Sequence, residues 1–306
     1  MGTTWTVKLV PSAQTPPLAQ LRAGIETRLA TVDAQMSTWK PDSDLSRFNR
    51  APAGSWQTFP PELFTVLQHA LQLARDTDGA YDPTVGALVG LWGFGPHKSK
   101  DTSAPDAGRI AQARQTVGWQ RLRIDADTRR VLQPGGSQLD LSSIAPGFAV
   151  DQIARYLDGI GVHDYLVEHG GELHARGQRP EGGAWRVGIE QPDAGDSDGL
   201  AMVVRLDNRG SGSSGDYRKF IEIDGQRRSH HIDPRTGAPV AHALASVTVL
   251  DTETLHADAN AAALMVLGPE QGLAYARRHG LAALFIVRSG QGFEQRMTPE
   301  FAAARE

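Results

Sequence analysis

The sequence predicts an α+β protein in which mixed, largely antiparallel sheets are flanked by helices. Segments with the pattern of strands follow one another without an intervening helix at residues 185–189, 201–206 and 219–223. Helical periodicity is confined to separate segments, such as residues 18–32 and 60–76. Many neighbouring strands are therefore expected to pair antiparallel, so we do not expect a doubly wound parallel sheet.

Length and composition narrow the class of protein. A chain of 306 residues can bury a large core, as one big domain or as two intimately joined subdomains. No internal repeat or low-complexity linker divides it, so residues 1–306 are taken as a single domain. With a net charge of −4 and no basic run, the chain lacks the marks of a nucleic-acid partner. The longest apolar runs fall far short of the ~20 residues that span a bilayer. The absence of cysteine excludes disulfides, thiolate metal sites and a cysteine nucleophile.

The first half of the chain alternates strands and helices. Residues 5–10 alternate as a strand does, and residues 18–32 place apolar side chains three and four apart, as an amphipathic helix does. Residues 60–76 form a second helix that begins at a proline. A further helix is expected at residues 110–117, and a hairpin at 122–124 and 130–132.

The second half contains more strands. Beyond those given above, strands are expected at 138–141, 165–167, 246–250 and 282–287, and helices at 149–157, from 256 to near Gly268, and at 272–279.

Residues 139–151 (LDLSSIAPGFAVD) connect a strand to a helix through small residues and a Pro-Gly turn. A helix N-terminus presents unpaired N–H groups, and small residues let a ligand approach the backbone. The segment therefore suits an anion, although an ordinary strand-to-helix connection would look the same.

Two earlier segments combine polar and aromatic residues. Residues 36–49 are expected to form a polar loop that could include a short helix, and in it Trp39 and Phe48 could serve as a ligand platform or simply anchor the loop in the core. In residues 79–86, glycines flank Tyr81 and Asp82, which permits close approach of a ligand to the backbone or merely ends the preceding helix.

The late chain holds three polar clusters. Residues 211–217 are expected to form a glycine-serine loop able to point donors at an anion, and residues 229–237 contain His230 and His231 beside an acid and an arginine. The third cluster, residues 256–265, enters a helix with Asp258 among small side chains. Asp258 could simply cap that helix. It would repel a phosphate unless a cation lay between them, which is the arrangement of a Mg²⁺-bridged pyrophosphate.

Taken in order, these segments resemble the ApbE family, the FAD:protein FMN transferases. The segments that carry the resemblance span nearly the whole chain: residues 1–3, 36–49, 79–86, 139–151, 169–173, 214–217, 230–237 and 256–264.

The resemblance implies the reaction and the site. The family transfers the FMN half of FAD, with Mg²⁺, onto a threonine or serine hydroxyl of a target protein and releases AMP. For this chain, the resemblance implies a metal held by the Ala145 carbonyl and the Asp258 carboxylate, with position 262 completing the metal shell. It also implies that the FAD site is lined by Met1, Trp39, Ala80, Tyr81, Asp82, Ser142, Phe148 and Ile232.

The chemistry assigns roles to two of these groups. Attack on a phosphodiester requires neutralised phosphate oxygens and a deprotonated or oriented hydroxyl. A cation at Asp258 meets the first need, and His231 is the candidate base for the second because imidazole titrates near neutrality. A structural hydrogen bond that holds the turn at Asp233 is the alternative for His231. His230 is expected to be structural or exposed.

Two positions depart from the family pattern. The threonine usually found four residues after the metal aspartate is Ala262 here, and the loss of one oxygen ligand should weaken Mg²⁺ binding. The family's common lysine after Ala145 is Pro146, which removes a positive charge. Two alternatives to FMN transfer stay open: hydrolysis of FAD to FMN and AMP, which differs in whether an acceptor protein can dock, and flavin binding with weak catalysis, which Ala262 favours.

The resemblance also implies partners and a compartment. The acceptor would be a flavin-carrying protein of a membrane redox complex, and the protein would act on the exported, periplasmic side of a bacterial inner membrane. A leader would then have been removed from this chain.

Overall fold

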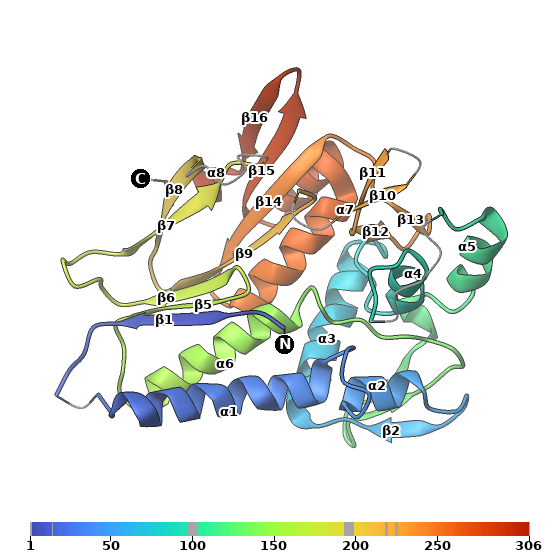
Figure 1. Ribbon diagram of the computed structural model, residues 1–306, viewed down its shortest axis with the longest axis horizontal. Helices are drawn as coiled ribbons and strands as arrows, with labels where there is room; N and C mark the ends of the chain where they lie inside the picture. Colours follow the sequence, from blue (N-terminus) through green and yellow to red (C-terminus); the bar gives the residue numbers. More distant parts are fainter. Residues whose placement is uncertain are drawn as a thin grey trace. The chain divides into compact units, whose positions relative to one another are not determined.

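The fold is described from a computed structural model that covers residues 2–13, 15–96, 103–192, 199–217, 220–223 and 226–305 (Figure 1). The chain divides into two compact units, each built from separate stretches of sequence. Unit 1 comprises residues 1–30, 146–217 and 242–306, and unit 2 comprises residues 31–145 and 218–241.

Unit 1 is organised around a seven-stranded antiparallel sheet (Figure 1). Its strand order is β1-β5-β6-β9-β14-β15-β16. The strands are β1 (Trp5–Leu9), β5 (Tyr165–His169), β6 (Glu172–Arg176), β9 (Arg209–Gly215), β14 (Leu244–Asp251), β15 (Ala282–Ser289) and β16 (Gly292–Met297). Because β6 and β14 flank it, the glycine- and serine-rich β9 is a central strand.

Helices cover this sheet where its strands are apolar. Helix α6 (Ala145–Gly159) and the first part of α1 (Leu18–Met36) share a buried cluster with β1 and β5. Helix α7 (Thr254–Arg278), kinked at Gly268, packs on β9, β14 and β15. Successive residues of β15 alternate between two clusters: Phe285 contacts the α7 side, whereas Leu284 joins the cluster of the β7–β8 hairpin and α8. These last elements are β7 (Trp185–Glu190), β8 (Leu200–Leu206) and α8 (Pro299–Ala302).

Unit 2 combines short helices with small sheets. Its sheets are a three-stranded one, in the order β2-β4-β3, and two two-stranded pairs, β10–β11 and β12–β13. Buried apolar residues of α4, β10 and β12 form one cluster. The elements are α2 (Asp44–Asn49), β2 (Trp56–Thr58), α3 (Pro61–Asp76), α4 (Gly86–Leu91), α5 (Ala107–Arg114), η1 (Trp119–Arg121), β3 (Arg123–Asp125), β4 (Arg130–Leu132), β10 (Phe220–Ile223), β11 (Gln226–Ser229), β12 (Ile232–Asp233) and β13 (Ala238–Pro239).

The predicted fold class is confirmed: helices flank sheets whose strands pair antiparallel. Residue 219 of the strand expected at 219–223 lies outside the described residues, and β10 begins at Phe220. Within the described residues, no helix is both long and apolar enough to cross a membrane.

Two predicted elements were wrong. Residues 138–141 form no strand beyond a single bridge, because the side chain of Asn49 bonds both the N–H and the C=O of Leu139, at 2.7 and 2.9 Å. Residues 211–217 are not a donor loop. Most of them belong to β9, where the hydroxyl of Ser213 meets that of Thr248 on the neighbouring strand at 2.9 Å.

Candidate functional site

The glycines of β9 bring the start of α7 unusually close to the sheet. A Cβ added at Gly210 would lie 2.4 Å from Thr254 Oγ1, and one at Gly212 would lie 2.4 Å from the backbone nitrogen of Asp258. Real Cβ atoms do not approach other atoms this closely, so only glycine fits at either position. The composition that resembled a flexible loop therefore serves to seat α7, and with it Asp258.

Replacing Gly212 with alanine should consequently displace α7. We expect a loss of roughly 1–3 kcal/mol in the free energy of unfolding, as for other overpacked core positions, together with weaker function through Asp258. Chemical denaturation and FAD turnover measure both effects. Gly159→Ala is the control, because nothing lies within 4 Å of a Cβ at that site. Equal stability of the Gly212 variant and the wild type would contradict this account of β9.

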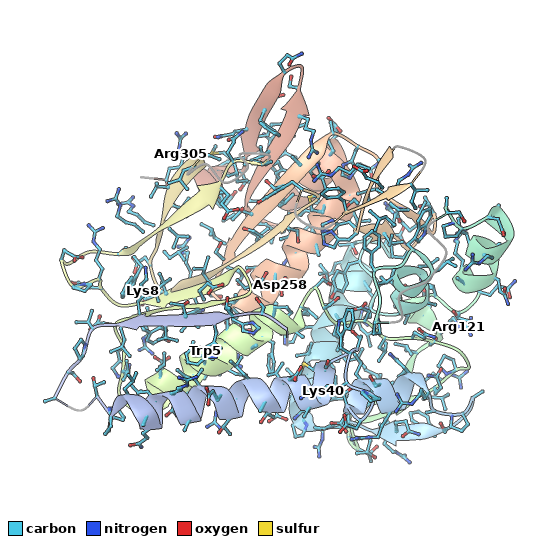
Figure 2. All side chains as sticks on the ribbon, viewed as in Figure 1. Trp5, Lys8, Lys40, Arg121, Asp258 and Arg305 are labelled. Atoms are coloured by element: carbon cyan, nitrogen blue, oxygen red, sulfur yellow. The ribbon has the colours of Figure 1, made fainter. Side chains whose placement is uncertain are left out.

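Asp258 lies in the first turns of α7 and is only 4% exposed (Figure 2). Its Oδ2 accepts a hydrogen bond from the N–H of Gly147, in the first turn of α6, at 2.9 Å. A Cβ at Gly147 would lie 2.5 Å from the carbonyl oxygen of Thr254, so this close crossing of the two helix starts also requires glycine. Asp258 thus bonds across helices rather than capping its own.

The environment of Asp258 opposes its negative charge. Burial, with a smaller contribution from the nearby charge of Asp151, raises the pKa of its carboxyl, the bond from Gly147 lowers it, and the net result is a pKa of about 7. A buried carboxyl whose pKa lies near 7, with no cationic partner among the described residues, is typical of a functional position.

The remaining oxygen of Asp258 suits a cation. Among the described residues, no hydrogen bond reaches its Oδ1. The described residues also contain no group of three or more His, Asp or Glu side chains that could hold a metal. Mg²⁺ commonly takes one or two carboxylates together with waters and phosphate oxygens. A single available carboxylate oxygen therefore fits a Mg²⁺ whose other ligands come mainly from substrate and solvent.

Two other predicted metal positions contribute little by their side chains. Ala262 lies one turn beyond Asp258 on α7, is 8% exposed and presents a methyl group instead of an oxygen. Ala145 is the first residue of α6 and has only its backbone carbonyl to offer; Pro146 follows it in the first turn, where a missing N–H costs no helix bond.

Asp82, in unit 2, holds two loops together. Its Oδ1 accepts from the N–H and the hydroxyl of Thr84, at 2.8 and 2.6 Å, and its Oδ2 accepts from the N–H of Trp119 at 2.9 Å. The hydroxyl of Thr84 in turn accepts from the N–H of Gly118 at 2.7 Å. Burial raises the pKa of Asp82, while these bonds lower it. Since both carboxylate oxygens are used internally, a contact of this segment with FAD would have to come mainly from its backbone.

The other predicted FAD residues differ in accessibility. Trp39 is 64% exposed, and Ser142 is exposed with its hydroxyl donating to Asp140 at 2.6 Å. Tyr81 is buried, and its hydroxyl lies 3.3 Å from that of Ser143. Ala80, Phe148 and Ile232 are buried as well.

The predicted site residues are divided between the two units. Phe148, Asp258 and Ala262 belong to unit 1, and Trp39, Ala80, Tyr81, Asp82, Ser142, Ala145, His231 and Ile232 to unit 2. Met1 lies outside the described residues.

His230 and His231 form a ring pair whose centroids are 4.0 Å apart. His231 is 8% exposed, and its Nδ1 lies 3.1 Å from Ser229 Oγ, which also accepts the backbone N–H of His231 at 3.1 Å. His230 is half-buried and meets the ring of Phe94 edge-on. The turn at Asp233 is held by its own groups, because the Asp233 carboxylate binds the Arg235 guanidinium through two bonds of 2.9 Å. Ser229 therefore orients the ring of His231.

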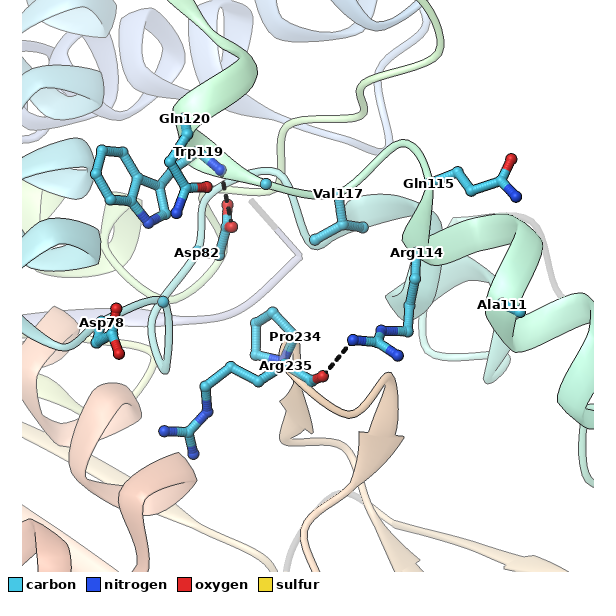
Figure 3. Close-up of a pocket in the computed structure, with 12 residues that line it drawn as sticks. Asp78, Asp82, Ala111, Arg114, Gln115, Val117, Trp119, Gln120, Pro234 and Arg235 are labelled. Atoms are coloured by element: carbon cyan, nitrogen blue, oxygen red, sulfur yellow. Dashed lines mark hydrogen bonds between the residues drawn. The ribbon is translucent and has the colours of Figure 1, made fainter.

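A cavity of about 340 Å³ opens within unit 2 (Figure 3). Asp82 and Gly79 form part of its wall, and the guanidinium of Arg114 donates to the carbonyl of Arg235 at 2.6 Å beside it. Among the described residues, the indole N–H of Trp119, another lining residue, is buried without an acceptor. The cavity is large enough for a nucleobase-sized ring, with polar groups to meet its edges.

Sequence reasoning identified Asp82 but missed Arg114, Gln115, Trp119 and Gln120 in the same wall. Their segment shows only helical periodicity and a turn, and no motif connects it to residues 79–86. The signal that could have drawn attention to it is Gly118, whose φ of 136° places a non-helical residue directly before Trp119.

Known proteins with the same architecture are transferases. The sequence matches the description "ApbE family" over residues 1–285. It is 41% identical to the FAD:protein FMN transferase of Klebsiella pneumoniae (strain 342), over 98% of this chain and 86% of that protein. It is 38% identical to that of Haemophilus influenzae, over 100% and 90%.

Solved structures agree with these matches. The apo form of the Pseudomonas stutzeri flavinyl transferase ApbE has a TM-score of 0.91 and 45% identity, covering 100% of this chain and 94% of its own. The flavin transferase ApbE of Vibrio cholerae has a TM-score of 0.92 and 36% identity, covering 99% and 96%. Fold and relatives together define an enzyme of the transferase class. The chain belongs to the ApbE family.

Proposed function

We propose that this protein transfers FMN from FAD to a threonine or serine hydroxyl of a target protein, with Mg²⁺, and releases AMP. The observation that carries the proposal is Asp258, a buried carboxylate with one oxygen fixed by Gly147 and the other without a hydrogen bond from any residue that the structure describes. Burial raises the pKa of this carboxyl, and a cation held beside it would favour the charged form. The names of the relatives, FAD:protein FMN transferase, supply the substrate class.

The reaction is a displacement at phosphorus. The acceptor oxygen bonds to the phosphorus of the FMN half, the bond from that phosphorus to the bridging oxygen breaks, and AMP leaves with the electron pair. The product is a phosphoester of the acceptor side chain. When bound, Mg²⁺ would offset charge on the pyrophosphate oxygens.

The chain's own residues bind, orient and accept the proton. The Asp258 carboxylate holds the cation site, and Trp39, which is 64% exposed, offers a face for flavin stacking. The imidazole of His231, oriented by Ser229, receives the proton of the acceptor hydroxyl. The partly exposed ring of His230 beside it is the second candidate for this proton.

Ala262 favours a second candidate function, flavin binding with weak catalysis. Without a side-chain oxygen at this position, the metal shell has one protein ligand fewer than the resemblance implies. Incubation of the protein with FAD, Mg²⁺ and a flavin-acceptor domain separates the candidates. A fluorescent flavin covalently bound to the acceptor indicates transfer, and intact FAD indicates binding only. Free FMN and AMP with an unlabelled acceptor would indicate hydrolysis.

Replacing Ala262 with threonine should strengthen metal binding, because the new hydroxyl lies one helical turn from the Asp258 carboxylate. We expect the apparent Kd for Mg²⁺ in the presence of FAD to fall by about 3–10-fold, as one added oxygen ligand would give. Calorimetric titration measures it. Ala262→Val, which has the shape of threonine without the oxygen, is the matched control and should bind Mg²⁺ no better than the wild type. An identical response of both variants would exclude a metal role for this position.

The compartment and the acceptor are proposed from the resemblance alone. We place the protein on the periplasmic side of a bacterial inner membrane, with a flavin-carrying subunit of a membrane redox complex as its acceptor. Fractionation of the native organism, with detection of the protein in each fraction, tests the compartment. Recovery in the cytoplasmic fraction alone would contradict it.

A further inference from the structure

The starts of α6 and α7 bond to each other in both directions. The N–H groups of Thr254 and Leu255, the first two residues of α7, donate to Asp151 Oδ1 and Oδ2, each at 2.9 Å. In return, the N–H of Gly147 on α6 donates to Asp258 on α7 at 2.9 Å. On α6 the donor lies four residues before the acceptor, about one turn, and on α7 the two donors lie four and three residues before Asp258. The two carboxylates therefore close a ring of contacts between the helices.

Asp151 is built to serve this ring. It is 3% exposed, and the residue at the N-cap position of α7, Glu253, makes no capping bond with its own side chain. The cap that α7 needs is thus supplied by the neighbouring helix. His174 on β6 supports it, with Nδ1 3.1 Å from the hydroxyl of Thr254 and 3.5 Å from Asp151 Oδ1.

We propose that Asp151 is a positioning residue for Asp258: by capping α7 from α6, it fixes the register in which the Asp258 carboxylate meets Gly147 and faces a cation. The inference rests on the proposed function insofar as Asp258 is the metal ligand. The positioning itself does not depend on that assignment. A carboxylate is required at position 151 because two N–H groups must be accepted side by side, whereas an amide has a single acceptor oxygen.

The first test reads the geometry directly, in protein free of FAD and metal. Asp151→Asn should speed hydrogen exchange of the Gly147 amide by at least about 10-fold beyond any change in global stability, because a displaced α7 no longer protects it. Asp106→Ala is the control: Asp106 caps α5 by accepting from the N–H of Arg109 at 2.8 Å, so this variant loses a helix cap in the other unit. Its Gly147 exchange should equal that of the wild type. Unchanged Gly147 exchange in the Asp151 variant would overturn the proposal.

The second test reads the consequence at the metal, with Mn²⁺ as a spectroscopic probe and FAD present. Asp151→Asn should weaken Mn²⁺ binding by about 10-fold, and most of the activity lost at low Mg²⁺ should return at saturating Mg²⁺. If Asp151→Asn does not fold, Asp151→Glu replaces it in both tests. It keeps two acceptor oxygens, one methylene further out, and should give smaller effects of the same sign.

The outcomes of the two tests are distinguishable. If Asp151→Asn binds Mn²⁺ as tightly as the wild type does, the proposed effect of Asp151 on metal binding is overturned. No Mn²⁺ binding by the wild type would overturn the metal site of the proposed function, while exchange at Gly147 would still decide whether Asp151 positions Asp258.

Discussion

Replacing Asp258 with asparagine should abolish FMN transfer and, without metal, make the protein more stable at pH 8. Asparagine keeps an acceptor for the N–H of Gly147 but loses the negative charge that would bind the cation. We expect transfer to fall by at least about 100-fold, the scale on which lost electrostatic stabilisation acts. At pH 8 without metal, the inactive variant should therefore have a larger free energy of unfolding than the wild type.

The sign follows from the raised pKa. An unfolded aspartate ionises near pH 4, whereas folded Asp258 does so at about 7. Between these values the unfolded state releases its proton first, so the free energy of unfolding falls as pH rises to about 7 and stays low above it. The variant escapes this loss and should gain roughly 2–4 kcal/mol at pH 8 and less at pH 5. Denaturant unfolding in EDTA at both pH values measures the gain. A wild type more stable than the variant at pH 8 would contradict the description of Asp258.

Removing the imidazole of His231 should stop chemistry while leaving FAD bound. Loss of a general base typically costs about 10²–10⁴-fold in turnover. His231→Gln keeps a polar side chain and should retain its FAD affinity within about 3-fold, because a base acts on the acceptor hydroxyl and not on FAD. Single-turnover transfer and fluorescence titration with FAD measure the two quantities separately.

His230→Gln is the matched comparison, since the two rings lie 4.0 Å apart. If His231 is the base, its variant also loses the acidic limb of the pH–rate profile and the His230 variant keeps it. The reverse pattern would assign the proton to His230. Full activity of both variants would remove this pair from the chemistry.

Much of the fold could be predicted because its helices and strands have regular periodicity. The apolar stripe of α3 and the alternating burial of β5 can each be predicted from the residues of that segment alone. β9 could not be predicted this way. Its glycines are required because α7 lies directly on them. Gly212, for example, packs against the backbone of Asp258, and the two residues are far apart in the sequence. A close helix-to-strand approach looks in sequence like a flexible loop.

In the candidate site, too, residues marked by a local sequence feature could be predicted, and residues that act through distant contacts could not. Asp258 stood out as an acid among tiny side chains at a helix start, a local feature. Asp151 reads as one polar residue on an amphipathic helix, and only the fold shows that it caps a different helix 103 and 104 residues further along the chain. Trp119 was missed for the same reason. Its backbone N–H donates to the Asp82 carboxylate, and no residue pattern in the sequence indicates this bond.

The most direct test of the proposed function is the intact mass of an acceptor protein after incubation with this protein, FAD and Mg²⁺, with AMP measured in the same sample. Transfer predicts that the acceptor gains the mass of one FMN less one water, with one AMP released for each FMN attached. The gain should disappear with Asp258→Asn and with EDTA. If FMN and AMP form in equal amounts while the mass of the acceptor stays unchanged, FAD is hydrolysed, and this result would contradict FMN transfer.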